Sequence, residues 1–105
     1  MPITNFQKRV YKLTARIPIG KVATYQGIAV ALGQPKASRA VGNALNKNPY
    51  APQVPCHRVI RSNGEIGGFA SGSDKKRLIL RKEGVMVINN KIDLARYGHN
   101  FKIKK

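Results

Sequence analysis

The sequence contains one cysteine, no tryptophan and only four acidic residues, and it has no long hydrophobic run. A lone cysteine cannot form an internal disulfide, and the lack of paired cysteines argues against a structural zinc site. We therefore expect neither a metal nor a cofactor. No apolar run approaches the roughly 20 residues that a membrane-spanning helix needs, and the N-terminus has no apolar signal core. These absences predict an intracellular, cytoplasmic protein without a membrane partner.

The scarcity of acid leaves the positive charge of the chain uncompensated. Twenty Lys and Arg residues against four Asp and Glu give a formal net charge of +16. This excess predicts a polyanionic partner, and nucleic acid comes before an anionic membrane surface because phosphate neutralisation supplies most non-specific binding. An organism whose proteins are generally basic would explain the lysines, but it does not explain so few acids. With 105 residues, we expect one domain over residues 1–105 and a monomer.

The first amphipathic pattern predicts a helix over residues 4–17. Thr4 or Asn5 is the expected N-cap, and Pro18 ends the helix because it disfavours the α conformation of the residue before it. Apolar residues recur at spacings of three or four, as on the buried face of a helix. The residues of this face are Phe6, Val10, Leu13 and Ile17.

Two shorter helices follow, joined by a glycine-containing turn. One is capped by Thr24 and ends at Gly33, and the other runs from about residue 36 to 46. Their expected core residues are Ile28, Ala29 and Leu32, then Ala37, Ala40, Val41, Ala44 and Leu45. The polar face of the third helix shows Ser38, Arg39, Asn43 and Lys47. This arrangement is typical of a DNA-binding helix-turn-helix, although helical hairpins also occur in purely structural roles.

The only cysteine, Cys56, is followed directly by His57. A free cysteine is often a small buried hydrophobe, but cationic neighbours also stabilise a reactive thiolate. Pro55 can supply a first helical position, which would place Cys56 at a helix N-terminus, where the dipole favours a thiolate. Glu83 is the candidate acid, because a carboxylate near the end of a predicted helix breaks a local preference.

The remaining segments are short. Asn63-Gly64 predicts a tight reversal, and residues 66–72 form a glycine-rich loop. A last helix is expected from Ser73 or Asp74 to Glu83, with Leu78 and Ile79 as its apolar residues. Residues 85–94 resemble a small hairpin with Asn89-Asn90 as its turn. The prediction is a mainly α fold with a small β element.

Four blocks of the sequence together resemble one known family, the O6-alkylguanine-DNA alkyltransferases. They occur in the family's order and spacing over about residues 5–86. The blocks are 17–25 (IPIGKVATY), 39–44 (RAVGNA), 55–60 (PCHRVI) and 68–70 (GFA). The resemblance implies a winged-helix-like helix-turn-helix domain that docks in the minor groove of double-stranded DNA containing O6-alkylguanine. Such a protein flips the damaged nucleotide out of the duplex and takes its alkyl group irreversibly onto cysteine.

The resemblance assigns the reaction to four residues. Cys56 is the implied acceptor of the alkyl group. His57 is the implied base, which activates the thiol through a water molecule and is supported by Glu83. Asn48 is the residue that would hold the active-site turn.

The resemblance assigns five further residues to the DNA and the flipped base. Arg39 would fill the gap that the base leaves in the stack, and Tyr25 would rotate the phosphate and contact the purine. Val59 and Ala70 would contact the base through backbone groups, while Phe69, a tyrosine in many relatives, would line the pocket. With Ser38 and Asn43 of the third helix, these residues complete the expected DNA-binding set.

The enzymes of this family usually carry an additional N-terminal domain, for which we expect no room in 105 residues. In length, and in residues 93–98 (DLARYG), the chain resembles the alkyltransferase-like proteins, which mark alkylated DNA for other repair proteins without reacting. Those proteins typically replace the cysteine, often with tryptophan, whereas this chain keeps Cys56. Three functions therefore remain open: a single-turnover repair enzyme, a lesion-recognition protein, and a basic DNA-binding domain with a structural cysteine.

Overall fold

A computed structural model describes residues 4–50, 53–67 and 73–101. Its elements are α1 (Asn5–Thr14), β1 (Ala23–Thr24), α2 (Tyr25–Ala31), α3 (Ser38–Asn46), the 3₁₀ helix η1 (Cys56–Arg58), β2 (Val59–Ile60), α4 (Ser73–Lys82) and α5 (Leu94–Tyr97). The predicted fold class, mainly α with a small β element, is confirmed. Within the described ranges no helix is both long enough and apolar enough to cross a bilayer.

α1 begins at the predicted N-cap and ends one turn earlier than predicted. The Thr4 hydroxyl accepts from the backbone N–H of Gln7, and the Gln7 side chain accepts from the backbone N–H of Thr4, which completes a capping box. The helix ends at Thr14. Ile17 is buried but belongs to the turn that follows, because Pro18 keeps it out of a helical conformation.

α2 and α3 form the predicted helix-turn-helix pair. The Thr24 hydroxyl caps α2 by accepting from the N–H of Gly27, and Gly33 ends it with a φ of +77°. α3 starts at Ser38, two residues later than predicted. Val41, Ala44 and Leu45 of α3 are buried as expected, whereas the prediction for Ala40 is wrong: its side chain is exposed. Ala40 lies at the solvent-exposed edge of the apolar face of α3, because Val41 lies at the centre of that face.

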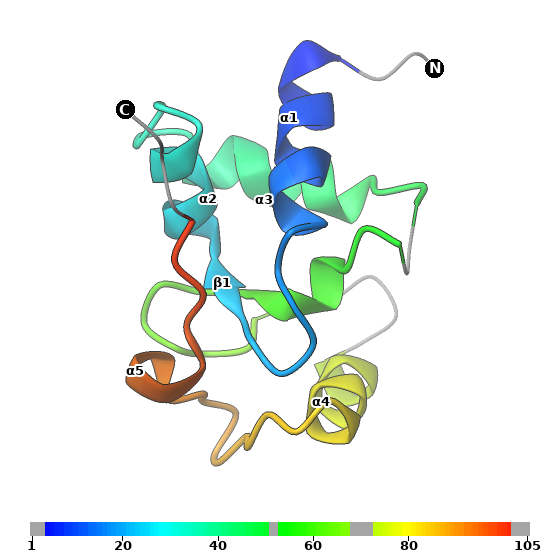
Figure 1. Cartoon of the computed structure of the whole chain (residues 1–105), viewed down its shortest axis with the longest axis vertical. Helices are drawn as coiled ribbons and strands as arrows, with labels where there is room; N and C mark the ends of the chain where they lie inside the picture. Colours follow the sequence, from blue (N-terminus) through cyan, green and yellow to red (C-terminus); the bar gives the residue numbers. More distant parts are fainter. Residues whose placement is uncertain (1–3, 51–52, 68–72, 102–105) are drawn as a thin grey trace.

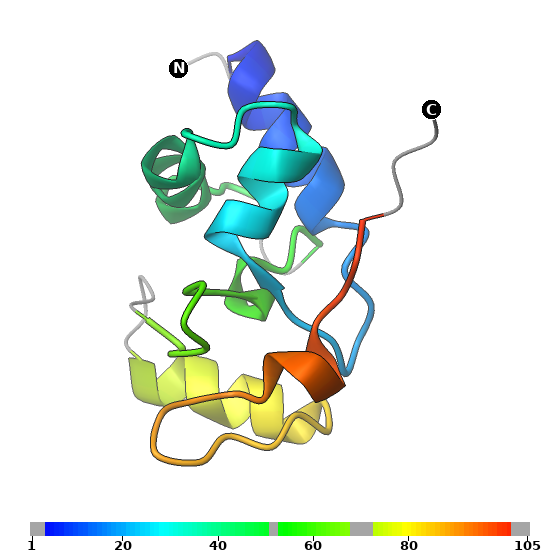
Figure 2. The same cartoon turned by 90° about the vertical axis from the view of Figure 1, so that its left-hand side faces the viewer.

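The two strands lie between two hydrophobic cores (Figures 1 and 2). They pair in parallel with Ala23 opposite Val59, and these two residues belong to the core beneath α1–α3. Val22 and Ile60, which point to the other side, belong to the core beneath α4 and α5. We call these the helical core and the distal core. The sheet connects them, and β2 directly continues the helix η1 that carries the cysteine.

The distal end of the molecule differs most from the prediction. α4 buries Leu80, whereas Leu78 is 58% exposed. Asn89 and Asn90 do form a left-handed turn, and Ile88 and Lys91 exchange two backbone hydrogen bonds across it. The hairpin extends no further as a regular ladder, since α5 already begins at Leu94.

Candidate functional site

Cys56 begins a short segment that both cores hold. We call residues 56–60, which comprise η1 and β2, the thiol segment. Cys56 is half-buried and packs against the helical core. The turn before it is fixed by Asn48, whose side-chain amide donates to the carbonyl of Val54 (2.8 Å) and whose oxygen accepts from the N–H of Tyr50 (2.9 Å). The thiol therefore follows a turn that these hydrogen bonds hold in place, and the protein interior does not enclose it.

The prediction that a helix dipole supports Cys56 is wrong. Pro55 occupies the N-cap position, with φ −82° and ψ 73°, and the helix after it is a single 3₁₀ turn of three residues. A macrodipole needs aligned peptides over several turns, so this turn contributes little to a thiolate. Any charge that stabilises sulfur must come from side chains.

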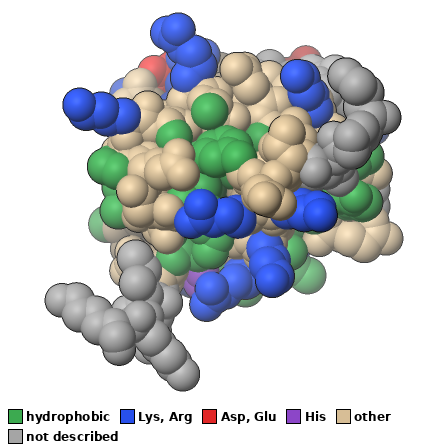
Figure 3. Space-filling model, turned by 90° about the horizontal axis from the view of Figure 1, so that it is seen from above, with side chains coloured by type: hydrophobic (Ala, Val, Ile, Leu, Met, Phe, Trp, Pro, Cys, Tyr) green, Lys and Arg blue, Asp and Glu red, His purple; other side chains and the backbone are tan. Residues whose placement is uncertain are grey.

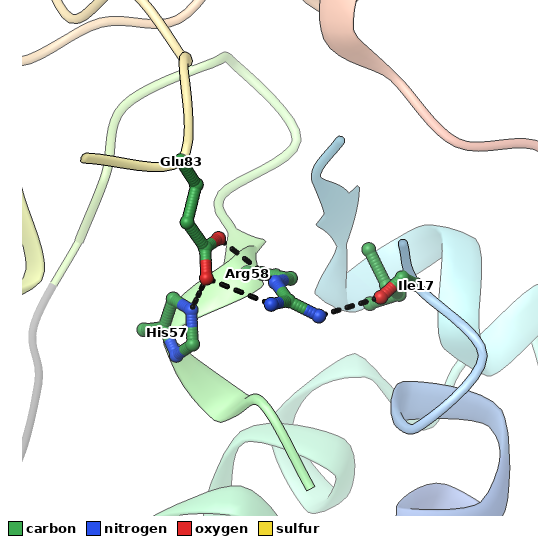
Figure 4. Close-up of polar contacts among 4 residues, drawn as sticks. All are labelled: Ile17, His57, Arg58 and Glu83. Atoms are coloured by element: carbon green, nitrogen blue, oxygen red, sulfur yellow. Dashed lines mark hydrogen bonds and ion pairs between the residues drawn. The ribbon is translucent and has the colours of Figure 1, made fainter. Parts of the chain in front are cut away.

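Glu83 links the histidine of the thiol segment to the end of α4 (Figure 4). Its Oε2 lies 3.0 Å from Nε2 of His57 and accepts from Nη2 of Arg58 at 2.7 Å, while Oε1 accepts from Nε of Arg58 at 2.9 Å. The third nitrogen of the guanidinium, Nη1, donates to the carbonyl of Ile17 (2.8 Å). Arg58 thus joins the acid to the loop that leads out of α1.

This network favours a neutral His57 that donates to an ionised Glu83. The hydrogen bond from Arg58 is the main cause that lowers the pKa of Glu83; burial opposes it, and the bond from His57 assists it. Burial is the main cause that lowers the pKa of His57, against the opposing effect of Glu83. Because an ionised carboxylate only accepts, Nε2 carries the imidazole proton, and Nδ1 is left as the basic nitrogen.

A groove of about 580 Å³ lies between α2, α3 and the turn after β2. Tyr25, Arg39 and Asn43, all predicted site residues, line it together with Arg61. Tyr25 packs against the helical core, as Cys56 does. Burial raises the pKa of its phenol, and a charge on Cys56 raises it further. The groove therefore lies along α3 and brings predicted DNA-binding residues from α2 and α3 together.

The other predicted residues are placed as follows. Ser38 also lines the groove, but its hydroxyl donates to the side-chain oxygen of Gln26, which joins the start of α3 to α2. Val59 is buried, and its carbonyl accepts a hydrogen bond of 2.7 Å from Nζ of Lys76. Phe69 and Ala70 lie outside the described residues.

Sequence reasoning missed Lys76 as a member of the site, and it named Arg58 only as a cationic neighbour of the thiol, not as the partner of Glu83. Lys76 is one of several cationic residues of α4, yet its side chain is fully buried. The signal that finds it is helical spacing counted backward from Glu83, since positions 83, 80 and 76 share one face. Arg58 stands in the resembling block, but only the fold shows that it holds the acid.

Lys and Arg side chains are scattered over the end of the molecule near α1. Figure 3, which looks down on the end of the molecule near α1, shows Lys and Arg side chains around a hydrophobic area, with acidic side chains only at the edge. Among the described residues, no three His, Cys, Asp or Glu side chains gather closely enough to hold a metal ion.

Residues 5–85 match the sequence family described as 6-O-methylguanine DNA methyltransferase, DNA binding domain. A methylated-DNA–protein-cysteine methyltransferase of Methanosarcina acetivorans is 54% identical over 81 residues, which are 77% of this chain and 52% of that protein. The chain thus spans about half the length of this relative.

Two solved structures resemble the fold closely. The Mycobacterium tuberculosis OGT in complex with DNA has a TM-score of 0.76 and 44% identity, over 79% of this chain and 51% of that one. Schizosaccharomyces pombe Atl1, in complex with damaged DNA containing O6-carboxymethylguanine, has a TM-score of 0.83 and 34% identity, over 98% of this chain and 100% of that one. The likeness extends along the whole chain in the second case only.

Proposed function

Because this chain belongs to the family defined by the DNA-binding domain of 6-O-methylguanine DNA methyltransferase, we propose that it repairs DNA by moving an alkyl group from O6 of guanine onto Cys56. The observation that carries the proposal is the half-buried thiol followed by an imidazole that Glu83 holds through Nε2. A thiolate is a soft nucleophile that attacks an sp³ carbon without needing an oxyanion hole. The groups present are therefore chemically sufficient.

In the proposed reaction, Nδ1 of His57 takes the thiol proton through a water molecule, and Glu83 stabilises the imidazolium that results. The sulfur of Cys56 then attacks the alkyl carbon, so that an S–C bond forms while the C–O6 bond breaks. The electron pair of that bond passes to the guanine, which takes up one proton and is left as an ordinary base. Cys56 becomes a stable thioether, and each molecule acts once.

The DNA would bind along the groove that α3 and Tyr25 line. In this proposal α3 enters the minor groove, Arg39 occupies the gap in the stack, and the flipped guanine passes Tyr25 toward the sulfur. Arg39 is exposed and lies on the same groove as Tyr25, which supports this path. The net charge of +16 would supply the phosphate attraction.

A second function has one observation in its favour. Atl1 matches this chain over its full length, and its structure contains damaged DNA. On this alternative, the protein would bind O6-alkylguanine in DNA, keep the alkyl group where it is, and recruit other repair proteins. Cys56 would then be a pocket residue and not an acceptor.

Intact-protein mass spectrometry separates the two functions. After incubation with a duplex that contains one O6-methylguanine, transfer predicts that a methyl group replaces one hydrogen of the protein, located on Cys56, and that Cys56→Ala gains nothing. Recognition without transfer predicts an unchanged mass at any protein excess, with selective binding of the lesion kept in Cys56→Ala. Equal affinity of the wild type for damaged and undamaged duplexes, without transfer, would contradict both functions.

A further inference from the structure

A second groove, of about 750 Å³, lies between α1 and the segment that follows α3. We call it the α1 groove. It shares no described lining residue with the groove beside α3, so neither alkyl transfer nor the DNA path proposed above uses it. Its described lining residues are Asn5, Lys8, Arg9, Tyr11, Lys12, Ala15, Tyr50 and Val54.

The floor of the α1 groove is apolar. Tyr11 and Val54 are only 5% and 8% exposed. The Tyr50 ring is 47% exposed and packs edge-on against that of Tyr11, with 5.8 Å between the ring centroids. The Tyr11 hydroxyl already donates to the carbonyl of Ala44, so Tyr11 offers carbon surface and not a free hydrogen-bond donor. The part of an occupant that lies on this floor should therefore be apolar.

The rim of the α1 groove is cationic. Lys8, Arg9 and Lys12 all lie on α1, and all three are exposed. Lys8 and Lys12 are four residues apart, so their like charges lie side by side on one face of the helix and disfavour it. α1 contains no acid, and none of the ion pairs among the described residues involves these three cations. An anion bound at the rim would relieve this repulsion.

The acids of this chain are engaged elsewhere. Glu83 and Asp74 each pair with an arginine. Asp93 caps α5, and Glu65 accepts a hydrogen bond from Asn63. A second copy of the chain would bring the same net charge of +16 against the rim, which is repulsive. The complementary charge must therefore come from a different molecule.

We propose that the α1 groove binds an acidic, amphipathic segment of another protein, whose apolar side chains lie on Tyr50 and Val54 and whose carboxylates pair with Lys8 and Lys12. Charge complementarity with the rim requires the acid, and the apolar floor requires the amphipathic pattern. Nucleic acid also complements the rim, but its phosphates and sugars supply no apolar side chain for the floor. The inference goes beyond the proposed function, since it gives the DNA-bound protein a surface that holds a further protein.

The test measures by fluorescence anisotropy how tightly the full chain binds a fluorescein-labelled peptide of Glu, Leu and Phe, patterned as an amphipathic helix. At about 0.15 M ionic strength, which screens distant charges, we expect saturable binding of one peptide per chain. Lys8→Gln combined with Lys12→Gln should weaken it roughly five- to tenfold, because two exposed ion pairs are lost. Tyr50→Ala should weaken it roughly fivefold, because part of the apolar floor is removed.

Two controls separate the groove from general electrostatic attraction. Lys75→Gln combined with Lys82→Gln removes the same charge from exposed lysines of α4 and should change the affinity by less than about twofold. A peptide with Ser in place of Leu and Phe keeps the acid and should bind the wild type roughly tenfold more weakly. Circular dichroism reports the fold of each variant. The double variants change only exposed lysines, so their comparison does not depend on Tyr50→Ala keeping its fold.

The proposal is overturned if the wild type does not bind the peptide, or if it binds the serine peptide equally well. Equal losses of affinity in the α1 and α4 double variants overturn it too, since the attraction would then be unspecific. The affinity for an undamaged DNA duplex identifies the other possible occupant. If the α1 double variant loses as much affinity for the duplex as for the peptide, the groove binds nucleic acid and the proposal fails. A loss confined to the peptide supports it.

Discussion

The helical core and the distal side of the molecule bury different kinds of side chain. Beneath α1–α3 the buried residues that the structure describes are apolar except for two hydroxyl groups: that of Thr14 donates to the carbonyl of Val10 within its own helix, and that of Tyr11 donates to the carbonyl of Ala44. On the other side of the sheet, α4 brings Lys76 and Glu83 against the thiol segment, where His57 is buried too. The same small domain thus contains one region built for stability and one that accommodates charge.

This difference indicates that the two regions have different roles. Apolar burial and local caps stabilise the helices that carry the groove, and substitutions there should change stability before chemistry. Buried charges stabilise a fold poorly, because desolvation offsets their attraction. The charges on the distal side instead hold His57, Arg58 and the Val59 carbonyl through hydrogen bonds.

The largest effect is expected from Glu83→Gln. The amide cannot stabilise an imidazolium on His57, so we expect the single-turnover rate of methyl transfer to fall roughly 10²- to 10³-fold. Because Glu83 does not line the groove beside α3, the affinity for DNA should stay within about twofold of wild type, a change near the limit of a surface substitution. Quenched-flow transfer assays and fluorescence anisotropy measure the two quantities separately.

Asp74→Asn is the matched control for that variant. Asp74 lies on α4, the helix that ends just before Glu83, and pairs with Arg77, but its side chain is 89% exposed. It should transfer methyl groups as fast as wild type. A Glu83→Gln protein that also keeps the wild-type rate would mean that the acid is structural, and the division between the two regions would fail.

An intermediate effect, on the free energy of unfolding, is expected when the pH is lowered. His57 has a pKa below its ordinary 6.5, so the unfolded chain takes up this proton first as the pH falls. Glu83 has a pKa below its ordinary 4.5, so its stabilising contribution is complete above that value and is lost as the pH falls through the lower pKa of the folded state. The free energy of unfolding should therefore decrease from about pH 6.5 downward, in two stages.

Urea denaturation at a series of pH values measures this decrease. His99 also has a pKa lowered mainly by burial, so His99→Gln is needed to isolate the share that belongs to His57. In Glu83→Gln the second stage should disappear. A free energy of unfolding that stays constant between neutral pH and pH 4 would contradict the protonation states assigned to the site.

The smallest effect is expected in the helical core, from Tyr11→Phe. The Tyr11 hydroxyl donates to the carbonyl of Ala44 (2.6 Å) in a buried contact between α1 and α3. Its loss leaves that carbonyl without this donor, at a cost of about 1–2 kcal/mol in the free energy of unfolding. The rate at which the Cys56 thiol reacts with iodoacetamide should not change.

Tyr50→Phe supplies the comparison for Tyr11→Phe. The Tyr50 ring packs edge-on against that of Tyr11, but Tyr50 is 47% exposed. We expect a change within about 0.5 kcal/mol. Equal losses in the two variants would show that the buried hydrogen bond does not hold α1 to α3.

Prediction from sequence succeeded best in the helices. The caps Thr4 and Thr24 and the terminal Gly33 were found because each acts on backbone groups only a few residues away. Helix ends were less accurate: α1 stops at Thr14 and α3 starts at Ser38. The exact ends depend on packing of the connecting turns, which periodicity does not record.

The candidate site was found in part. Cys56, His57 and Glu83 were grouped in advance, and the fold does bring His57 and Glu83 together. The dipole expected behind Cys56 is absent, and Lys76 was hidden among the other cations of α4. A sequence gives the charge of a lysine but not the side of the helix that other elements cover.

The sequence by itself determined the charge, the helical patterns, the caps and the presence of a single thiol next to a histidine, because each is a property of one residue or of near neighbours. Tertiary structure alone decided that Arg58 joins Glu83 to Ile17 and that Lys76 is buried beside the thiol segment. Those pairs are 25, 41 and 17 residues apart along the chain. The free energy of such contacts depends on desolvation, and burial is set only when the sheet brings the two cores together.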